Sequence, residues 1–268
     1  MGRIFDRLSR AIGAAGEDLL DMALDRRCPG CGGAPPRGVE VCDACDARVG
    51  RSGVALCLRC LRGDPALPGP LRGCPRHGDS RLLIAGPAFA SPLDRIVHSF
   101  KYEGGASLAR WIAALLPEPP GLRGDLGREY ALVPVSLHPA RRARRGFDQA
   151  ELIARDASER WGIPVVEALG RVRDHEPQAR LDPERRRSNV DGAFRVRLPS
   201  AIRGRPLLLI DDVATTGATL LAAAAALEGQ GAGWILSLTA SHGGDPDREE
   251  DQGEVAARRP VVIDFPTW

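Results

Sequence analysis

The stretch LLLIDDVATTGATL, at residues 207–220, places two adjacent acids after an apolar run and follows them with threonines and a glycine. The apolar run indicates a buried strand, and a helix is expected to begin near residue 217 or 218. The free N–H groups and the positive dipole end of such a helix form a natural phosphate site. Hydroxyl donors and a glycine that permits close backbone approach complete the pattern: Thr215, Thr216, Thr219 and Gly217.

The two acids of this stretch, Asp211 and Asp212, need a different partner, because carboxylates repel phosphate. Sugar hydroxyls and Mg²⁺ suit them, so the whole stretch predicts a receptor for a ribose 5-phosphate. It lacks the Gly-Lys-Ser/Thr ending of a nucleotide P-loop, the Asp-x-Asp of an aspartyl-phosphate phosphatase and the alternating acids of an EF-hand. A plain capped turn would account for one acid and one threonine, but not for the set.

The cysteines form a second candidate site. Three Cys-x-x-Cys pairs and one Cys-x-x-His pair lie before residue 78, and no cysteine follows, which argues against a disulfide framework. Two intervening residues let both ligands of a turn reach one ion, so the pairs predict two closed, structural zinc sites. Sequential pairing needs the shortest loops, and an interleaved, cross-braced pairing is the alternative. In the sequential arrangement one ion is held by Cys28, Cys31, Cys42 and Cys45, and the other by Cys57, Cys60, Cys74 and His77.

Beyond residue 80 apolar strands alternate with helices. The sequence predicts strands at 82–89, 130–137, 205–211 and 233–240, and helices at 107–116, 148–162 and 217–231. The helix at 148–162 opens with Asp148 as N-cap and Glu151 in a capping box. Continuous apolar strands separated by helices predict an α/β fold with a mostly parallel sheet flanked by helices.

These patterns divide the chain into four regions: an N-terminal amphipathic helix at 1–27, a zinc module at 28–80, the α/β domain at 81–242 and an acidic tail at 243–268. The module is rich in Gly, Pro and Cys and is expected to depend on metal rather than on an ordinary core. The net charge of +2 implies no partner by itself. No segment reaches the ~20 apolar residues of a membrane span or the apolar core of a signal peptide, so a cytoplasmic location is expected.

The stretch at 207–220 resembles the PRPP-binding loop of type I phosphoribosyltransferases, with its hydrophobic strand, two acids and Thr-Thr-Gly-x-Thr cradle. Further motifs are similar to the ComF (competence protein F) family: VPVSLHPARRARRGFDQAELIA at 133–154, FKYEGG at 100–105, the polar pattern at 171–189 and the N-terminal double zinc knuckle. The resemblance covers about residues 28–240 and implies a type I phosphoribosyltransferase fold with an N-terminal zinc-binding module.

The resemblance also implies roles for residues. Ribose hydroxyls and the 5-phosphate of PRPP would meet Asp211, Asp212, Val213, Ala214, Thr215, Thr216, Gly217, Ala218 and Thr219. Backbone donors to pyrophosphate would come from Val135, Ser136 and Leu137. Arginine and Mg²⁺ stabilise the charge of leaving pyrophosphate, and the basic candidates are Arg141, Arg144, above all Arg145, and Lys101. A solvated basic face or a nucleic-acid patch is the alternative for the arginines, and an ordinary surface lysine for Lys101.

The segment at 171–192 is polar and without apolar period, as expected of a lid over a reactive sugar phosphate. Gln178, Arg186 and Asn189 match the lid pattern of the family. The four histidines at 98, 138, 175 and 242 show no spacing that indicates metal binding or catalysis.

The implied activity is transfer of a phosphoribosyl group from Mg²⁺-PRPP to an acceptor that no residue identifies. The alternative is a DNA-uptake protein of natural transformation, which binds single-stranded DNA and works with the uptake machinery, with PRPP as ligand rather than substrate. Aromatic residues for base stacking are scarce, at 4% of the chain. A PRPP-binding regulator without chemistry is a third interpretation.

Overall fold

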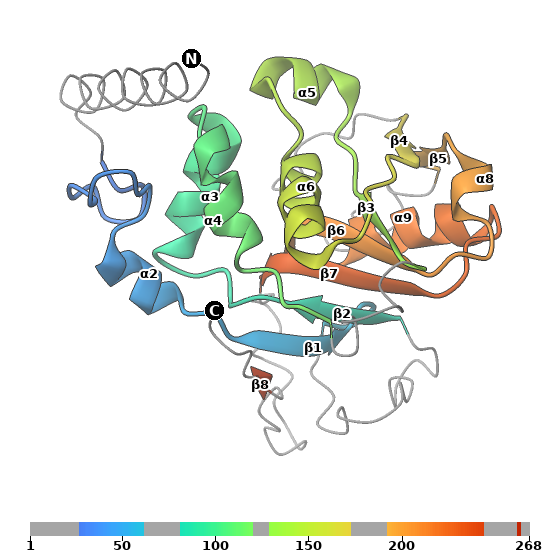
Figure 1. Ribbon diagram of the computed structural model, residues 1–268, viewed down its shortest axis with the longest axis horizontal. Coiled ribbons are helices and arrows are strands. Elements are labelled where there is room, and N and C mark those ends of the chain that lie inside the picture. Colours follow the sequence, from blue (N-terminus) through green and yellow to red (C-terminus); the bar gives the residue numbers. More distant parts are fainter. Residues whose placement is uncertain (1–26, 62–80, 120–128, 173–191, 244–261, 264–268) are drawn as a thin grey trace, which may run out of the picture.

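The computed structural model describes residues 27–61, 81–119, 129–172, 192–243 and 262–263 (Figure 1). The predicted N-terminal helix, the lid residues Gln178, Arg186 and Asn189, and the zinc ligands Cys74 and His77 lie outside the described residues. The elements follow in the order α2 (Asp43–Val49), β1 (Gly53–Cys57), β2 (Leu82–Ala85), α3 (Leu93–Tyr102), the 3₁₀ turn η1 (Ala106–Leu108), α4 (Ala109–Ala113), β3 (Ala131–Pro134), α5 (Pro139–Arg145), α6 (Gln149–Trp161), β4 (Leu169–Arg171), β5 (Phe194–Val196), α8 (Pro199–Ile202), β6 (Leu207–Ala214), α9 (Ala218–Glu228), β7 (Ile235–His242) and β8 (Val262–Ile263).

The central sheet has the strand order β3-β6-β7-β2-β1-β8. The pairs β3–β6, β6–β7 and β7–β2 are parallel, whereas β1 pairs antiparallel with β2 and with β8. Strands β4 and β5 form a separate antiparallel pair. The α/β class with a mostly parallel sheet is therefore confirmed.

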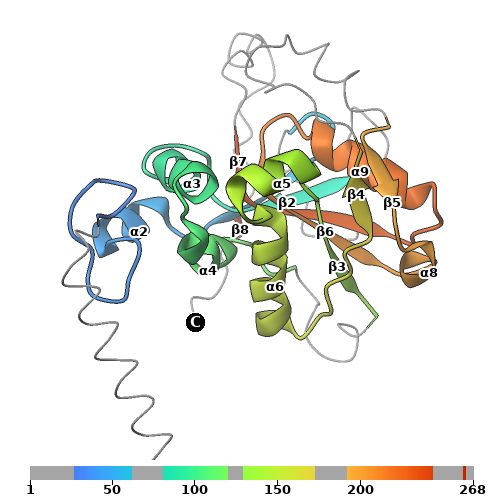
Figure 2. The same cartoon turned by 90° about the horizontal axis from the view of Figure 1, so that it is seen from above.

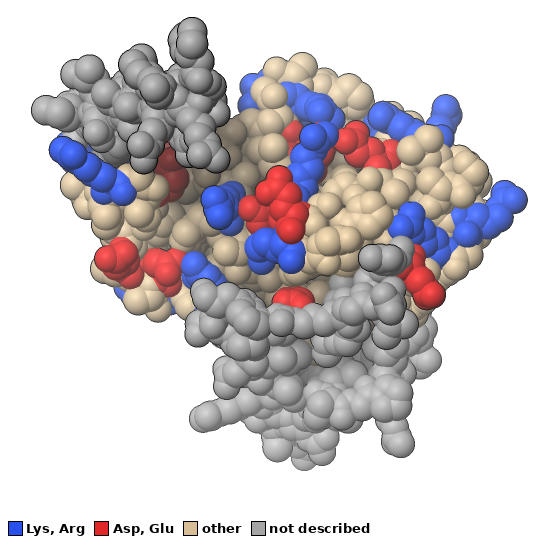
Figure 3. Space-filling view, viewed as in Figure 1, with Lys and Arg blue, Asp and Glu red and all other residues tan. Residues whose placement is uncertain are grey.

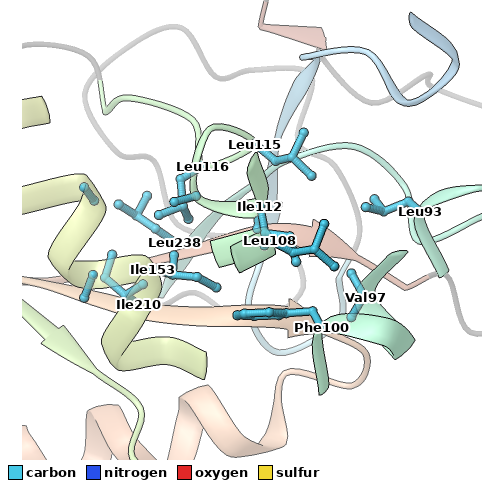
Figure 4. Packing of buried hydrophobic residues seen from close by; sticks show 14 of the residues in the cluster. Leu93, Val97, Phe100, Leu108, Ile112, Leu115, Leu116, Ile153, Ile210 and Leu238 are labelled. Atoms are coloured by element: carbon cyan, nitrogen blue, oxygen red, sulfur yellow. The ribbon is translucent and has the colours of Figure 1, made fainter. Parts of the chain in front are cut away.

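Helices cover both faces of the sheet (Figure 2). Leu208 and Ile210 of β6 belong to a core with α3, α4 and α6, while Leu207 and Leu209 belong to a core with α9. This alternation follows from the two-residue period of a strand. Figure 4 shows the first core, in which side chains from α3, α4 and α6 meet those of β6 and β7: Leu93, Val97, Phe100, Ile112, Ile153, Ile210 and Leu238.

Strand β1 corrects one expectation. The sequence predicts that residues 28–80 lack an ordinary core, but Val54, Leu56 and Leu58 are buried in the core that faces α9. They are buried because β1 pairs with β2 along four residues and so extends the central sheet. The prediction was wrong for β1 because a strand of five residues is too short to show a periodic apolar pattern. Its residues are buried only because the strand pairs with β2. The four-region division remains a prediction.

Most expected elements form with shifted ends. Helix α6 begins after Asp148, whose side chain accepts a hydrogen bond from the Glu151 N–H, so the predicted N-cap is confirmed. The expected helix at 107–116 is a 3₁₀ turn followed by the short α4. Helix α3 was not predicted, although its apolar residues recur at helical spacing: Leu93, Ile96, Val97 and Phe100.

Candidate functional site

The turn between β6 and α9 lies at the carboxyl edge of the parallel sheet. β6 ends at Ala214 and α9 begins at Ala218, where the sequence predicts a helix start. Gly217 precedes the helix with a φ of 72°, in the left-handed region that favours glycine. The Ala218 N–H donates to Thr216 Oγ1 across 3.4 Å, which is long for a hydrogen bond. The N-terminal end of an 11-residue helix thus faces the edge where ligands of open α/β sheets bind.

Gly217 also contacts the segment that follows β1. A Cβ built on Gly217 would lie 2.3 Å from the backbone oxygen of Leu58 and 3.3 Å from Leu58 Cδ1. Leu58 itself is 1% exposed and packs in the core that faces α9. Glycine is therefore required here by a tertiary contact as well as by its φ, a reason that the local sequence does not reveal.

The two acids at the end of β6 each hold the next backbone amide. The Asp212 N–H donates to Asp211 Oδ1 at 2.8 Å, and the Val213 N–H donates to Asp212 Oδ1 at 2.8 Å. Asp212 is 7% exposed, and its Oδ2 is buried and accepts no hydrogen bond of good geometry from the described residues. Its partner is instead an ion: Lys101 Nζ lies 2.6 Å from Oδ2.

Burial and charge shift the acid–base behaviour of this group of residues. Burial, together with the neighbouring charge of Asp212, raises the pKa of Asp211 well above its ordinary value. Burial disfavours the Lys101 ammonium, but the charge of Asp212 outweighs it and raises the pKa of Lys101. The ligand-free site therefore has a firm Lys101–Asp212 ion pair beside a second carboxyl group that resists ionisation.

Asp211→Asn is expected to raise the free energy of unfolding at pH 7 by about 1 kcal/mol, the scale of one stabilising change at a functional site. Because the pKa of Asp211 is raised in the folded state, its contribution is present at acid pH and lost as the pH rises through the folded-state pKa. The gain from Asn should therefore shrink as the pH falls toward the ordinary pKa of a carboxyl group. Urea unfolding at neutral and acid pH measures it, and an equal gain at both would contradict the assignment.

A pocket of about 760 Å³ opens at this edge of the sheet. Figure 3, in the same view as Figure 1, shows that the surface is hollowed between α3 and α5 and that basic side chains gather over α5 and α6. Ten of the sequence-predicted residues line the pocket: Lys101, Val135, Leu137, Arg141, Arg145, Asp211, Asp212, Val213, Thr215 and Thr219. Ser136, Arg144, Ala214, Thr216, Gly217 and Ala218 are not among its lining residues.

The loop after β3, where backbone donors were expected, has two of its three amides engaged. The Val135 N–H donates to the Ile210 oxygen at 2.9 Å, and the Leu137 N–H donates to Asp148 Oδ2 at 2.7 Å. Ser136 Oγ donates to the Leu169 oxygen at 2.8 Å, and its N–H has no acceptor among the residues that the structure describes. Asp148 thus joins this loop to α6 and lines the pocket, a second role beyond the predicted N-cap.

The arginines of α5 divide between the pocket and the surface. Arg145 donates to Gln149 Oε1 at 2.9 Å and to the Tyr102 hydroxyl at 3.1 Å, and its guanidinium lies over the Tyr102 ring. Arg141 also lines the pocket, whereas Arg144 is exposed outside it. Arg145, the arginine that the sequence favoured, is therefore held in place at the pocket.

Helix α3 supplies a pocket wall that the sequence interpretation missed. Asp94, Arg95, His98 and Tyr102 line the pocket together with Lys101. The apolar period of α3 places them, since residues between the buried positions must face outward. That period was the signal in the sequence from which this wall could have been found.

Four cysteines come together in the N-terminal module. The sulfur atoms of Cys28, Cys31, Cys42 and Cys45 all lie within 4.8 Å of one another. Burial, reinforced by the other three cysteines, raises the pKa of Cys45 to about 12. A divalent ion would supply the charge that four clustered thiolates need, so the set fits a structural zinc site. These four are the cysteines that the sequential pairing assigns to one ion, and Cys57 and Cys60 are not part of the cluster.

A polar cluster attaches the cysteine module to α4. Asp46 Oδ1 accepts hydrogen bonds from Trp111 Nε1 and from Arg51 at 2.6 Å each. The Arg51 guanidinium also lies 5.4 Å from the centroid of the Trp111 ring. Next to it, a Cβ on Gly30 would lie 3.2 Å from Pro92 Cβ, just before α3. The module therefore packs against α4 and against the start of α3, the helix that forms one wall of the pocket.

The curated proteins to which the chain is similar are DNA utilization and competence proteins. DNA utilization protein YhgH of Salmonella typhi is 31% identical over 209 residues, which span 74% of this chain and 90% of that protein. The chain belongs to the ComF/YhgH family. Competence protein F of Haemophilus influenzae is 27% identical over 206 residues and competence protein ComFC of Streptococcus pneumoniae 25% over 197, each with 83% of the relative covered. The resemblance to the ComF family is thereby confirmed.

Other comparisons add little to the ComF/YhgH assignment. No family model matches the chain. The solved structure of the allosteric regulatory enzyme of purine biosynthesis matches at a TM-score of 0.32 and 16% identity, over 52% of this chain and 26% of that one. Among the described residues of this ComF/YhgH protein, no helix has the length and apolar character to cross a membrane.

Proposed function

We propose that this ComF/YhgH-family protein binds PRPP with Mg²⁺ and transfers its phosphoribosyl group to an acceptor. The observation that carries the proposal is a single pocket lined by two acidic side chains, by residues of a strand-to-helix turn and by three basic side chains. The carboxylates are Asp211 and Asp212, and the cations that line the same pocket are Lys101, Arg141 and Arg145. A ligand with vicinal hydroxyls, one terminal phosphate and a second, more highly charged group matches this division.

Each end of such a ligand has a partner. The 5-phosphate would accept hydrogen bonds from the first turn of α9 and from the hydroxyls of Thr215 and Thr219, both of which line the pocket. The ribose hydroxyls would donate to Asp211 and Asp212. Asp212 Oδ2 is paired with the Lys101 ammonium at 2.6 Å in the ligand-free site, so a ribose hydroxyl would share or replace that partner.

The reaction breaks the bond between C1 of the ribose and the pyrophosphate oxygen. Pyrophosphate leaves with the bonding electron pair, the acceptor forms the new bond to C1, and the proton of the acceptor passes to solvent or to pyrophosphate. Mg²⁺, when bound with PRPP, neutralises charge on the leaving group. Arg145 would stabilise the same charge, since Gln149 and Tyr102 already orient its guanidinium toward the pocket.

Calorimetric titration of the protein with PRPP and Mg²⁺ tests the proposal. Asp212→Asn should weaken binding by about 10- to 100-fold, because a hydrogen bond to a charged group contributes roughly 1.5–3 kcal/mol. Thr219→Ala, at the phosphate end, is a second variant that leaves the carboxylates intact. Glu159→Gln removes the same charge from an exposed position of α6 outside the pocket and should bind as wild type does. Absence of PRPP binding by the wild type would refute the proposal. A screen of acceptors for pyrophosphate release then separates an enzyme from a binder.

A second candidate function is binding of single-stranded DNA, with PRPP as a ligand. It is favoured by the names of the relatives and by α5, which carries four arginines and no buried residue. Phosphate contacts make affinity fall with salt, and loss of one contact reduces that slope by about 1. Arg144→Ala should therefore reduce the salt slope of oligonucleotide binding by about 1, while Asp212→Asn should not change it. An unchanged slope in Arg144→Ala would exclude α5 as the DNA-binding surface.

A further inference from the structure

Lys101 is the only lysine in the sequence, although lysine and arginine together number 37. It lies on the last turn of α3, and its side chain crosses to β6, where Nζ reaches Asp212 Oδ2 at 2.6 Å. The two side chains are 23% and 10% exposed, so this is a largely buried ion pair inside the pocket. The other 36 of these residues are arginine, so the single lysine at position 101 indicates that an ammonium rather than a guanidinium is needed there.

The ammonium occupies the place where a divalent cation would bind. Carboxylate oxygens are the ligands that Mg²⁺ and Mn²⁺ prefer, and Asp212 Oδ2 is a buried carboxylate oxygen that accepts no hydrogen bond from a backbone amide of the described residues. A metal ion that approached Oδ2 would have to separate the ion pair and would meet the positive charge of Lys101. Arg145, which lines the same pocket, adds to that repulsion.

Lysine is better suited than arginine to act as a counter-ion that changes partners. Its ammonium is a compact charge on a flexible four-carbon chain, whereas a guanidinium forms a rigid two-pronged contact. Tyr102 and Glu103 follow Lys101, and the next residue, Gly104, has a φ of 72°, so α3 ends here. The Lys101 side chain can therefore exchange one anionic partner in the pocket for another without a rearrangement of α3.

We infer that Lys101 is a displaceable counter-ion that closes the Asp211–Asp212 edge to free divalent cations. A metal ion then enters only together with a phosphorylated ligand. The anionic groups of the ligand replace Asp212 as the partner of the Lys101 ammonium, and the metal neutralises the remaining charge of the ligand. The entry of the ligand rests on the proposed function, but the closure of the carboxylates by Lys101 does not. In the ligand-free protein the pair keeps adventitious metal away from Asp212 Oδ2.

Mn²⁺ binding without any phosphorylated ligand tests this inference. Lys101→Met, which removes the charge and keeps the length of the side chain, should bind Mn²⁺ at least about tenfold more tightly than wild type. Lys101→Arg keeps the charge and should remain closed, and Lys101→Met combined with Asp212→Asn should lose the gain. Equal Mn²⁺ affinity in wild type and Lys101→Met would overturn the inference.

A measurement on the wild type serves if Lys101→Met does not fold. Lysine-selective isotope labelling places a single lysine side-chain signal in the NMR spectrum, because the chain has one lysine. That signal should stay unmoved in excess Mg²⁺ and should shift when Mg²⁺ is added with pyrophosphate or PRPP. A shift with Mg²⁺ alone would contradict the closure. If Lys101→Met gains Mn²⁺ affinity but no phosphorylated ligand moves the signal, the closure stands and the proposed function fails.

Discussion

Cys45→Ser is expected to remove one metal ion per chain and to lower the free energy of unfolding by more than about 3 kcal/mol. Structural zinc contributes roughly 10 to 16 kcal/mol in isolated finger peptides, so even partial loss of the ion is a large effect. Cys45 is 3% exposed and belongs to the core shared with α3 and α4, so its replacement also places a hydroxyl in an apolar core. Metal analysis of the purified protein and urea unfolding measure the two effects.

The matched control is Ala44→Ser, which adds a hydroxyl at an exposed position of the same turn and leaves all four sulfur atoms in place. It should keep both the metal content and the stability of the wild type. Removal of metal from the wild type with a chelator should reproduce the loss of stability seen in Cys45→Ser. Full metal content in Cys45→Ser would show that the four cysteines do not form a metal site.

Gly217→Ala is expected to destabilise the protein by about 3 kcal/mol or more and to weaken PRPP binding. Two costs add. Alanine at a φ of 72° has a strained backbone, and its Cβ would lie 2.3 Å from the Leu58 oxygen, a steric clash that forces one of the two segments to move. Relief of that contact moves either the turn before α9 or the segment after β1. Since the turn presents the helix end to the pocket, affinity should fall together with stability.

Gly162→Ala separates these costs. Gly162 ends α6 with a φ of 69°, but a Cβ there would meet nothing within 4 Å. It should cost only the strain, about 1 kcal/mol, and leave ligand binding unchanged. Comparison of the two variants by urea unfolding and by calorimetric titration isolates the contact with Leu58. Equal losses of stability in both would mean that this contact contributes nothing.

Both predictions concern the same relation between the N-terminal module and the pocket. The cysteine cluster packs against the start of α3, whose far end carries Lys101. The segment after β1 packs under the turn that begins α9. The module therefore contacts two parts of the pocket wall, so a metal ion bound by its cysteines would also stabilise the proposed ligand site.

The sequence by itself determined the elements whose cause is local. The apolar run at 207–210, the two acids, the turn and the helix start at Ala218 follow from residue type and spacing, as do the N-cap at Asp148 and the cysteine set. Each depends on neighbours a few residues away, so periodicity, capping chemistry and ligand spacing are enough to predict it. The α/β class follows in the same way from the order of these elements.

Only the tertiary structure decided which distant residues meet. The 110 residues between Lys101 and Asp212 hold no signal for a 2.6 Å ion pair, which arises because α3 packs beside the carboxyl ends of the parallel strands. The burial of β1 and the need for glycine at 217 likewise come from contacts across the chain. Such contacts are set by how the sheet and its covering helices pack, and packing depends on all of their side chains together rather than on any local pattern.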